Sequence, residues 1–226
     1  MGNISINTIS VSGFQGAFQG MRAPMMSYDK SDSGYDEKTR CFIVGEKDMD
    51  LAKRLISGGS EHCKFRRMIH VQAQISLPRY ALSELDTYKI STVSNSESTM
   101  HRLLNTDKPI TEDQFYFGNP TTIMYGVTRF ISLPILEELE GLRQQYKDIK
   151  PTIFTKVELL TMAKRILPES FIQTRVWDVN YETLANIYNQ RVKHPHRLKE
   201  EWVDCFGSWV ESLPYAKELI IGDANV

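Results

Sequence analysis

The sequence predicts an α/β (α+β) fold in which helices surround a small sheet. Two stretches, 68–77 and 171–179, have the composition of strands, and the first alternates apolar and polar residues with a period of two. Several longer stretches place apolar residues three and four positions apart, as amphipathic helices do. No internal repeat or linker separates these stretches, so we expect residues 1–226 to form a single helix-rich domain.

The N-terminal segment 1–39 is expected to be partly irregular. It is rich in Gly, Ser, Gln and Met, and the run DKSDSGYDEKTR at 29–40 has the composition of an exposed loop. The next stretch, EKDMDLAKRLIS at 46–57, is predicted to be a short helix that the Gly58-Gly59 pair ends.

The stretch MIHVQAQISL at 68–77 is predicted to be a half-buried strand. Its apolar residues share one face and are Ile69, Val71, Ala73, Ile75 and Leu77. Its polar residues share the other face and are His70, Gln72, Gln74 and Ser76. Pro78 follows at a position where a helix can begin, and RYALSELDTYKI at 79–90 is expected to form that helix.

The C-terminal half is predicted to contain four helices and a strand. The expected elements are a loop at 105–122, a helix at 133–150 with Pro134 near its first turn, a helix at 155–167 that Pro168 stops, a strand at 171–179, a helix capped by Asn180, and a helix at 196–213. The apolar residues Leu198, Trp202, Phe206, Trp209 and Leu213 recur at helical spacing in the last of these and are expected in the core.

The composition narrows the class of protein. The net charge is -1, so no global electrostatic attraction to nucleic acid or to an anionic membrane is expected. No apolar run approaches membrane-spanning length, and three cysteines at unrelated spacings favour a reducing cytoplasm over a disulfide framework or a metal site. The pair of histidines in His194-Pro195-His196 is more typical of a turn than of a metal site, so no metal is predicted.

The hydroxyl-rich run STVSNSESTMH at 91–101 has two interpretations. Six of its eleven residues carry hydroxyls, and Glu97 is the only charged residue before the closing histidine. Composition alone favours a solvated linker. The alternative is the wall of a binding site, and the neighbouring stretches decide between the two.

In the helix after Asn180, Arg191 falls on the apolar side. Steps of about 100° per residue place Leu184, Ile187 and Tyr188 on one stripe, with Arg191 in its centre. The polar residues expected on the opposite side are Glu182, Asn186, Asn189 and Gln190. An inward arginine needs an anion, because burying an unpaired charge is costly. It either extends past the helix end or pairs with an internal glutamate, or it binds an anionic ligand such as a phosphate, and the pattern leaves these open.

The stretch LPESFIQTRVWDVNYETLANIYNQR at 167–191 resembles the flavin-dependent thymidylate synthases. That family runs through Leu-Pro, Thr-Arg and Trp-x-Val-Asn into a helix with a second Asn and a final Arg. The matching residues are Leu167-Pro168, Thr174-Arg175, Trp177, Val179-Asn180, Asn186 and Arg191, with one residue missing between Arg175 and Trp177. The resemblance implies that the two asparagines contact the flavin and that Arg191 contacts the bound deoxynucleotide. Glu182 replaces an arginine that the family has between the asparagines.

A second stretch, from Phe65 to His101, resembles the family's signature R-H-R-x-x-S-x-N-E-x-S-x-R-Y in degenerate form. Glu84 aligns near a family Gln, and Thr87-Tyr88-Lys89 align with Arg-His-Arg. Thr92 aligns with the Ser, and NSES at 95–98 aligns near Asn-Glu-x-Ser with one residue inserted. Met100-His101 replace the closing Arg-Tyr. Upstream, LISGGSEHCKF resembles the family's Gly-His-x-Thr-Pro-Phe turn, with His62 one place out of step. With this resemblance, the hydroxyl-rich run is expected to be a site wall.

The resemblance implies a reaction without a protein nucleophile. NADPH reduces FAD, methylenetetrahydrofolate supplies the carbon, and reduced flavin delivers hydride to the pyrimidine of dUMP. The residues expected to bind the nucleotide are Arg191, Lys89, Ser98, Glu97, Glu84, Ser96 and His101. The residues expected to bind the cofactor are Asn180, Asn186, Tyr88, Thr92 and His62. Replacing Arg-His-Arg by Thr-Tyr-Lys reduces two guanidinium groups to one ammonium, which weakens phosphate neutralisation.

Two functions therefore stay open for this sequence. The first is an enzyme that methylates dUMP or a related pyrimidine nucleotide. The second is a catalytically inactive nucleotide-binding protein that senses or sequesters its ligand. The resemblance also implies a homotetramer with shared sites, in which Lys89 and Arg191 would meet from different chains.

Overall fold

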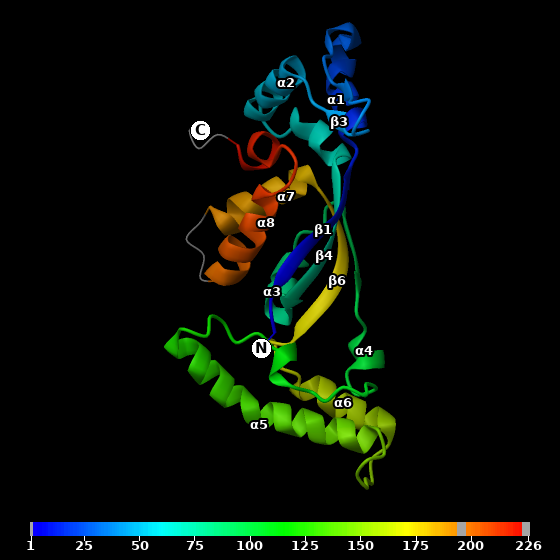
Figure 1. Ribbon diagram of the computed structural model, residues 1–226, viewed down its shortest axis with the longest axis vertical. Helices are drawn as coiled ribbons and strands as arrows, with labels where there is room; N and C mark the ends of the chain where they lie inside the picture. Colours follow the sequence, from blue (N-terminus) through cyan, green and yellow to red (C-terminus); the bar gives the residue numbers. More distant parts are fainter. Residues whose placement is uncertain (1, 194–197, 223–226) are drawn as a thin grey trace. The chain divides into compact units, whose positions relative to one another are not determined.

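This computed structural model of the protein describes residues 2–193 and 198–222. It contains a four-stranded sheet with the strand order β1-β4-β6-β5. β1, β4 and β6 lie side by side in it (Figure 1). The strands are β1 (Ser5–Ser12), β2 (Gly34–Tyr35), β3 (Phe42–Ile43), β4 (His70–Pro78), β5 (Thr92–Ser96) and β6 (Ile172–Asn180). β2 and β3 form a separate antiparallel pair.

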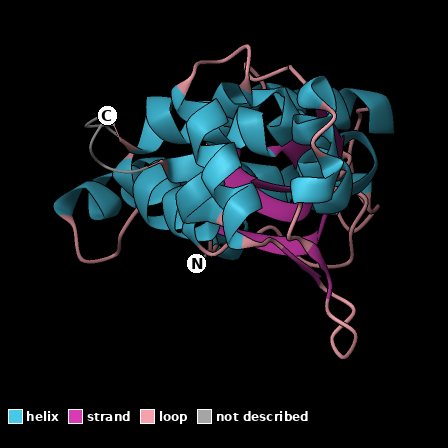
Figure 2. Cartoon of the chain, turned by 90° about the horizontal axis from the view of Figure 1, so that it is seen from above, coloured by secondary structure: helices cyan, strands magenta, loops and turns pink. Residues whose placement is uncertain are grey.

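Helices dominate the described residues, as Figure 2 shows. The α-helices are α1 (Phe14–Arg22), α2 (Glu46–Ser57), α3 (Arg79–Leu85), α4 (Thr99–Arg102), α5 (Ile123–Tyr146), α6 (Lys156–Ile166), α7 (Tyr181–Ile187) and α8 (Ser208–Glu211). The 3-10 helices are η1 (Ala23–Met25), η2 (Tyr28–Lys30), η3 (Cys63–Met68) and η4 (Glu112–Gln114), and the π-helices are η5 (Tyr188–Val192), η6 (Glu200–Gly207) and η7 (Lys217–Ile221).

The chain divides into two compact units. Unit 1 comprises residues 1–5, 75–87 and 95–175, and unit 2 comprises residues 6–74, 88–94 and 176–226. The expectation of a single domain over the whole chain stays a prediction.

The predicted strand at 68–77 is confirmed as β4. Its apolar face is closed to solvent, since Ile69, Val71, Ala73 and Ile75 are 0% exposed and Leu77 is 2% exposed. On the polar face, His70 Nδ1 lies 2.8 Å from Asp178 Oδ1, and the hydroxyls of Ser76 and Thr174 lie 3.0 Å apart. As β4 runs forward through these positions its partners on β6 run backward, so the two strands are antiparallel.

The N-terminal segment is more regular than its composition indicates. Its first part forms strand β1 and helix α1, and the part beyond Arg22 is built mainly of short turns and loops. α1 folds because Phe14, Ala17, Phe18 and Met21 recur at helical spacing and are buried. The glutamines between them, Gln15 and Gln19, are exposed, and with the two glycines they masked this pattern in the sequence.

Helix α5 starts earlier than predicted. It begins at Ile123 rather than residue 133, so Pro134 lies inside the helix and not near its first turn. The Thr122 hydroxyl caps it by accepting a hydrogen bond from the Tyr125 amide at 3.1 Å. The helices predicted at 46–57 and 155–167 are confirmed as α2 and α6, whereas the one predicted at 79–90 ends at Leu85.

α5 buries apolar side chains in its C-terminal half and exposes apolar side chains in its N-terminal half. The C-terminal half buries Leu136, Leu139 and Leu142 in the core of unit 1, where α5 packs against α6. The N-terminal half leaves five apolar side chains between 53% and 89% exposed: Ile123, Met124, Val127, Phe130 and Ile131. We call these five residues the α5 stripe. Its extent is unusual, because monomeric proteins rarely expose contiguous apolar patches of more than a few hundred Å².

Each unit has its own core. In unit 1, Leu103, Leu104, Phe115, Leu139 and Leu159 are among the side chains that close the space between α5, α6 and the loop 105–122. In unit 2, four of the five apolar residues predicted for the C-terminal helix are confirmed as core, since Trp202, Phe206, Trp209 and Leu213 are 1–6% exposed. The fifth, Leu198, is only partly buried. None of the described helices is both long and apolar enough to span a lipid bilayer.

The carboxyl of Glu140 on α5 is expected to make unit 1 sensitive to acid. Its two oxygens accept hydrogen bonds from Arg143 Nε and Nη2 at 2.7 and 2.8 Å, and one accepts from the Ile110 amide at 2.8 Å. The bonds from Arg143 lower the pKa of Glu140 to about 2. Because the pKa is lowered on folding, this stabilisation is complete above the unfolded value of 4.5 and is lost as pH falls toward 2.

We therefore expect the parent protein to lose about 2 kcal/mol more unfolding free energy between pH 6 and pH 3 than Glu140→Gln, which has no charge to titrate. Urea titrations at the two pH values measure this difference. Equal losses in the two proteins would contradict the assignment.

Candidate functional site

The helix that carries Arg191 begins as the sequence predicts. Asn180 Oδ1 accepts a hydrogen bond from the Thr183 amide at 2.8 Å and caps α7. Leu184, Ile187 and Tyr188 form the expected buried stripe. At Tyr188 the helix widens into the π-helix η5, a feature that propensities do not reveal and that often occurs at functional sites.

Arg191 is partly buried against two aromatic rings. Its Nε donates to the Tyr88 hydroxyl at 3.0 Å. Its guanidinium carbon lies 5.8 Å from the centre of the Tyr88 ring and 5.5 Å from that of the Trp202 ring, within the range of cation–π attraction. The Tyr88 hydroxyl in turn donates to Gln190 Oε1 at 2.9 Å. The orientation of the guanidinium is thus fixed by side chains from three segments of unit 2.

The segment 88–92 is tied to the same helix. The Thr183 hydroxyl donates to the Ile90 carbonyl at 2.9 Å, and the Thr92 hydroxyl donates to the Tyr88 carbonyl at 2.8 Å. The structure therefore brings the predicted residue Tyr88 next to Arg191, and it ties Thr92 to the Tyr88 backbone. Lys89 follows Tyr88 and is exposed.

The remaining predicted residues of unit 2 are more exposed to solvent. Asn186 lies on the exposed side of α7, as expected. His62 is 53% exposed at its side chain, and its Nε2 lies 3.8 Å from a carboxylate oxygen of Glu61. The roles of Asn186 and His62 stay predictions.

Glu182 is not on a solvated face, contrary to the sequence-based expectation. It is only 8% exposed, because its carboxylate pairs with the guanidinium of Arg67 from η3. The two residues are 115 positions apart in the chain, so helical periodicity could not reveal the pair. Where the resemblance has an arginine on α7, this chain has a glutamate that holds an arginine from another element.

Asn180 has a second feature besides its cap. The residue is 0% exposed, and its Nδ2 is buried without a hydrogen-bond partner among the described residues. A buried donor of this kind is rare in folded proteins and calls for a partner group.

In unit 1, part of the hydroxyl-rich run lines a pocket of about 290 Å³. Glu97 and Ser98 are the predicted residues in its wall. The backbone of Glu97 is held by β6, since its amide donates to the Thr174 carbonyl and its carbonyl accepts from Gln173 Nε2, both at 2.9 Å. The run is part strand and part helix, β5 and α4, which supports the site-wall interpretation over a linker.

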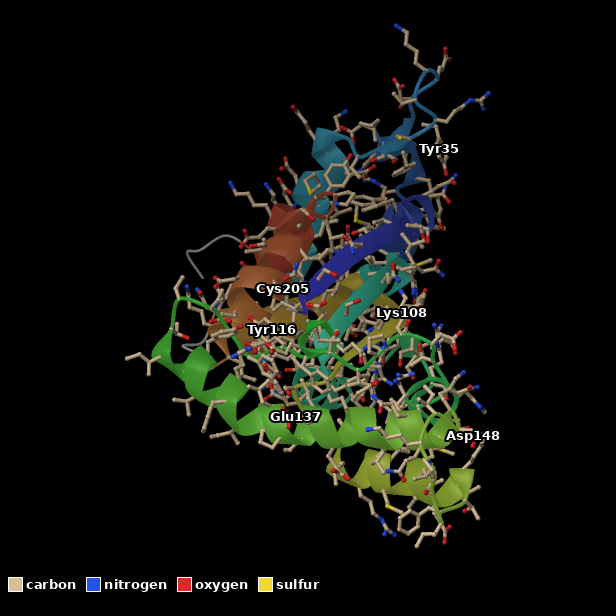
Figure 3. All side chains as sticks on the ribbon, turned by 60° about the horizontal axis from the view of Figure 1, so that its bottom comes forward. Tyr35, Lys108, Tyr116, Glu137, Asp148 and Cys205 are labelled. Carbon is tan, nitrogen blue, oxygen red and sulfur yellow. The ribbon has the colours of Figure 1, made fainter. Side chains whose placement is uncertain are left out.

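Sequence reasoning missed two cations in this pocket. Arg102 and Lys108 line it together with the hydroxyls of Ser98, Thr99 and Thr106. Lys108 is labelled in Figure 3. The sequence signal for Arg102 and Lys108 was their position after the hydroxyl-rich run. The other predicted residues of unit 1, Glu84, Ser96 and His101, are not among the residues that line this pocket.

Within 2–193 and 198–222, no group of three or more His, Cys, Asp or Glu side chains is placed to hold a metal ion. The pair His194 and His196 lies outside the described residues.

The fold, by contrast, has close counterparts among solved structures. Two crystal structures of ThyX from Helicobacter pylori with FAD and dUMP match with a TM-score of 0.70, at 18% and 19% identity, over 98% and 97% of this chain and 98% of theirs. The chain has the fold of the flavin-dependent thymidylate synthases. No protein-family model matches the sequence, and no curated protein does.

A second kind of enzyme shares the ThyX fold with this chain. The UMP/dUMP methylase PolB from Streptomyces cacaoi, bound with 5-Br dUMP, matches with a TM-score of 0.60 at 15% identity, over 93% of this chain and 91% of that one. The helix-rich α+β fold expected from the sequence is thereby confirmed. At such low identity, the resemblance could be detected only in the short stretches around 65–101 and 167–191.

Proposed function

We propose that this protein binds a pyrimidine nucleotide, dUMP or a close relative, as a ThyX-like nucleotide methylase or as a descendant of one. The observation that carries the proposal is the position of Arg191, which Tyr88 and Trp202 orient and which the sequence resemblance matches to the family's nucleotide arginine. A guanidinium held in one orientation binds a phosphate through paired hydrogen bonds. Lys89, which adjoins Tyr88 in the sequence, is proposed to add a second positive charge.

The proposed catalysis is weaker than that of a protein with the full signature. Thr87, Lys89 and Met100 replace three signature arginines, and each lost charge-assisted contact costs about 1.5–3 kcal/mol. The cations Arg102 and Lys108 offset part of this loss for a ligand in the unit 1 pocket. The alternative function, a nucleotide sensor or sponge without catalysis, is favoured by these same replacements.

The residues of unit 2 fit a flavin in two respects. The Asn180 amide presents a donor that lacks a partner within the described chain, and Arg67 supplies a guanidinium beside Glu182, where the family carries its own arginine. We propose that Asn180, Asn186, Tyr88, Thr92 and His62 hold FAD. When bound and reduced by NADPH, FAD supplies the hydride that converts a folate-derived one-carbon group into a methyl group. This chain's own residues orient the ring and neutralise the phosphates.

We further propose that the protein acts in the cytoplasm as a homotetramer. Neither proposal involves nucleic acid or a membrane, in keeping with a net charge of -1.

Supplying FAD, NADPH and methylenetetrahydrofolate in excess is expected to give dTMP from dUMP at a rate far below that of a ThyX with all signature arginines. dUMP binding itself is expected to be measurable by calorimetry. Visible absorbance of the concentrated protein reports bound oxidised flavin in the same sample. Turnover at the rate of a full-signature enzyme would show that Thr-Tyr-Lys replaces Arg-His-Arg and would remove the sponge alternative. Absence of both turnover and nucleotide binding would refute the proposal.

A further inference from the structure

Three basic side chains meet in a pocket of unit 2 that the proposed function does not use. The pocket has a volume of about 430 Å³. Lys53 comes from α2, Arg66 from η3, and Lys193 directly follows η5. Polar groups that can accept or donate hydrogen bonds also line it: Ser57, Ser60 and Asn189.

The three positive charges in this pocket exceed the single carboxylate, Glu218, that lines it. Arg66 Nη1 donates to the Leu219 carbonyl at 3.1 Å, and Lys193 Nζ donates to the Ile221 carbonyl at 2.7 Å. Both acceptors are neutral carbonyls, so they position the cations without neutralising their charges. Glu218 also lines the pocket, yet within the described chain none of the three cations forms an ion pair with it.

Arg66 provides the strongest indication that this pocket binds an anion. Its Nε is buried and has no hydrogen-bond partner among the residues 2–193 and 198–222. A guanidinium carries its donors in a fixed plane, so the Nε and one Nη together match two oxygens of a phosphate. A buried, charged donor left without an acceptor is destabilising, and an anion in the pocket would supply the acceptor.

We propose that this pocket binds the phosphate group of a small organic phosphate. Arg66 would hold the phosphate, with Lys53 and Lys193 supplying the remaining charge and Ser57 and Ser60 supplying hydroxyl hydrogen bonds. The aliphatic side chains that line the pocket, Ile56, Leu219, Ile220 and Ile221, give the organic part an apolar wall.

This site is separate from the proposed nucleotide arginine. Asn189 of η5 lines the pocket, whereas Arg191 of the same helix contacts Tyr88 and Trp202. The proposal therefore does not depend on the nucleotide-binding function and can be tested apart from it.

Inorganic pyrophosphate is a suitable probe, because it carries the proposed chemistry without a base or sugar. Isothermal titration calorimetry of the full chain at low salt is expected to detect its binding, and the double variant Lys53→Gln/Lys193→Gln is expected to bind at least tenfold more weakly. Lys47→Gln is the matched control, since Lys47 is exposed on the same helix and does not line the pocket. It is expected to bind like the parent.

Arg191→Ala separates the two sites. It is expected to weaken dUMP binding and to retain the pyrophosphate binding that the double variant Lys53→Gln/Lys193→Gln loses. Equal affinity of the double variant and the Lys47→Gln control would overturn the proposal, and so would loss of pyrophosphate binding in Arg191→Ala. Circular dichroism melts of all variants establish that a loss of binding is not a loss of fold, and Ser60→Ala, expected to weaken binding several-fold, tests the pocket without removing a charge.

Discussion

Arg191→Ala is expected to weaken dUMP binding at least tenfold and to leave the fold intact. A hydrogen bond between a guanidinium and a phosphate contributes about 1.5–3 kcal/mol, and each 1.4 kcal/mol corresponds to a factor of ten in affinity. The neighbours that orient Arg191, Tyr88 and Trp202, are also packed by other contacts, so alanine should not collapse their positions. Calorimetry with dUMP measures the affinity, and thermal unfolding measures the stability.

Two further variants sharpen this test. Arg191→Lys keeps the charge and loses the planar pair of donors, so it is expected to recover only part of the affinity. Arg165→Ala removes an exposed arginine from α6 and is expected to bind dUMP like the parent. Unchanged dUMP affinity in Arg191→Ala would refute the role of this residue. A large loss of stability would instead favour the alternative that Arg191 is a structural ion-pair partner.

The sequence was sufficient to predict the structure wherever a residue and its near neighbours in the chain determine it. The alternation in β4, the Asn180 cap and the buried stripe of Leu184 and Ile187 all follow from spacing within a few positions. The resemblance then gave the fold, because it combined two such stretches.

Two of the misses, at Glu182 and Arg191, come from contact between distant segments. Glu182 is buried because Arg67 reaches it from η3, and Arg191 is oriented by Tyr88 and Trp202. A single sequence contains no signal for such pairs. The late start predicted for α5 has a different cause: its first turns expose apolar residues, which do not follow the usual pattern of one buried and one polar face.

That same exposed pattern makes α5 the expected site of self-association. An apolar stripe on a helix is normally buried. The core of unit 1 covers the apolar side chains in the C-terminal half of α5, and the α5 stripe in the N-terminal half lacks a polar cover. Gly126 adjoins the stripe, and a Cβ built on it would meet nothing within 4 Å. Glycine in the middle of a helix costs about 1 kcal/mol relative to alanine, and close approach of a second backbone would account for it.

A second copy of this chain is the partner we propose for the α5 stripe. Two copies of one helix can pack antiparallel about a two-fold axis, so that each stripe covers the other. Such an isologous contact would give a dimer, and a further interface would complete the proposed tetramer. Charged residues begin to dominate this face only beyond Pro134, with Glu137, labelled on α5 in Figure 3, and Glu138.

Phe130→Glu is therefore expected to dissociate the assembly into smaller species. Phe130 is 75% exposed in the single chain, so a glutamate there costs the monomer little, whereas in the helix pair it would bring a charge into an apolar contact. Sedimentation velocity measures the change, with an expected shift from the mass of the parent assembly to half of it or less. Met25→Glu is the matched control: Met25 is 83% exposed outside the α5 stripe, and this variant is expected to sediment like the parent. A parent protein that sediments as a single chain would refute self-association, and a Phe130→Glu variant that keeps the parental mass would place the interface elsewhere.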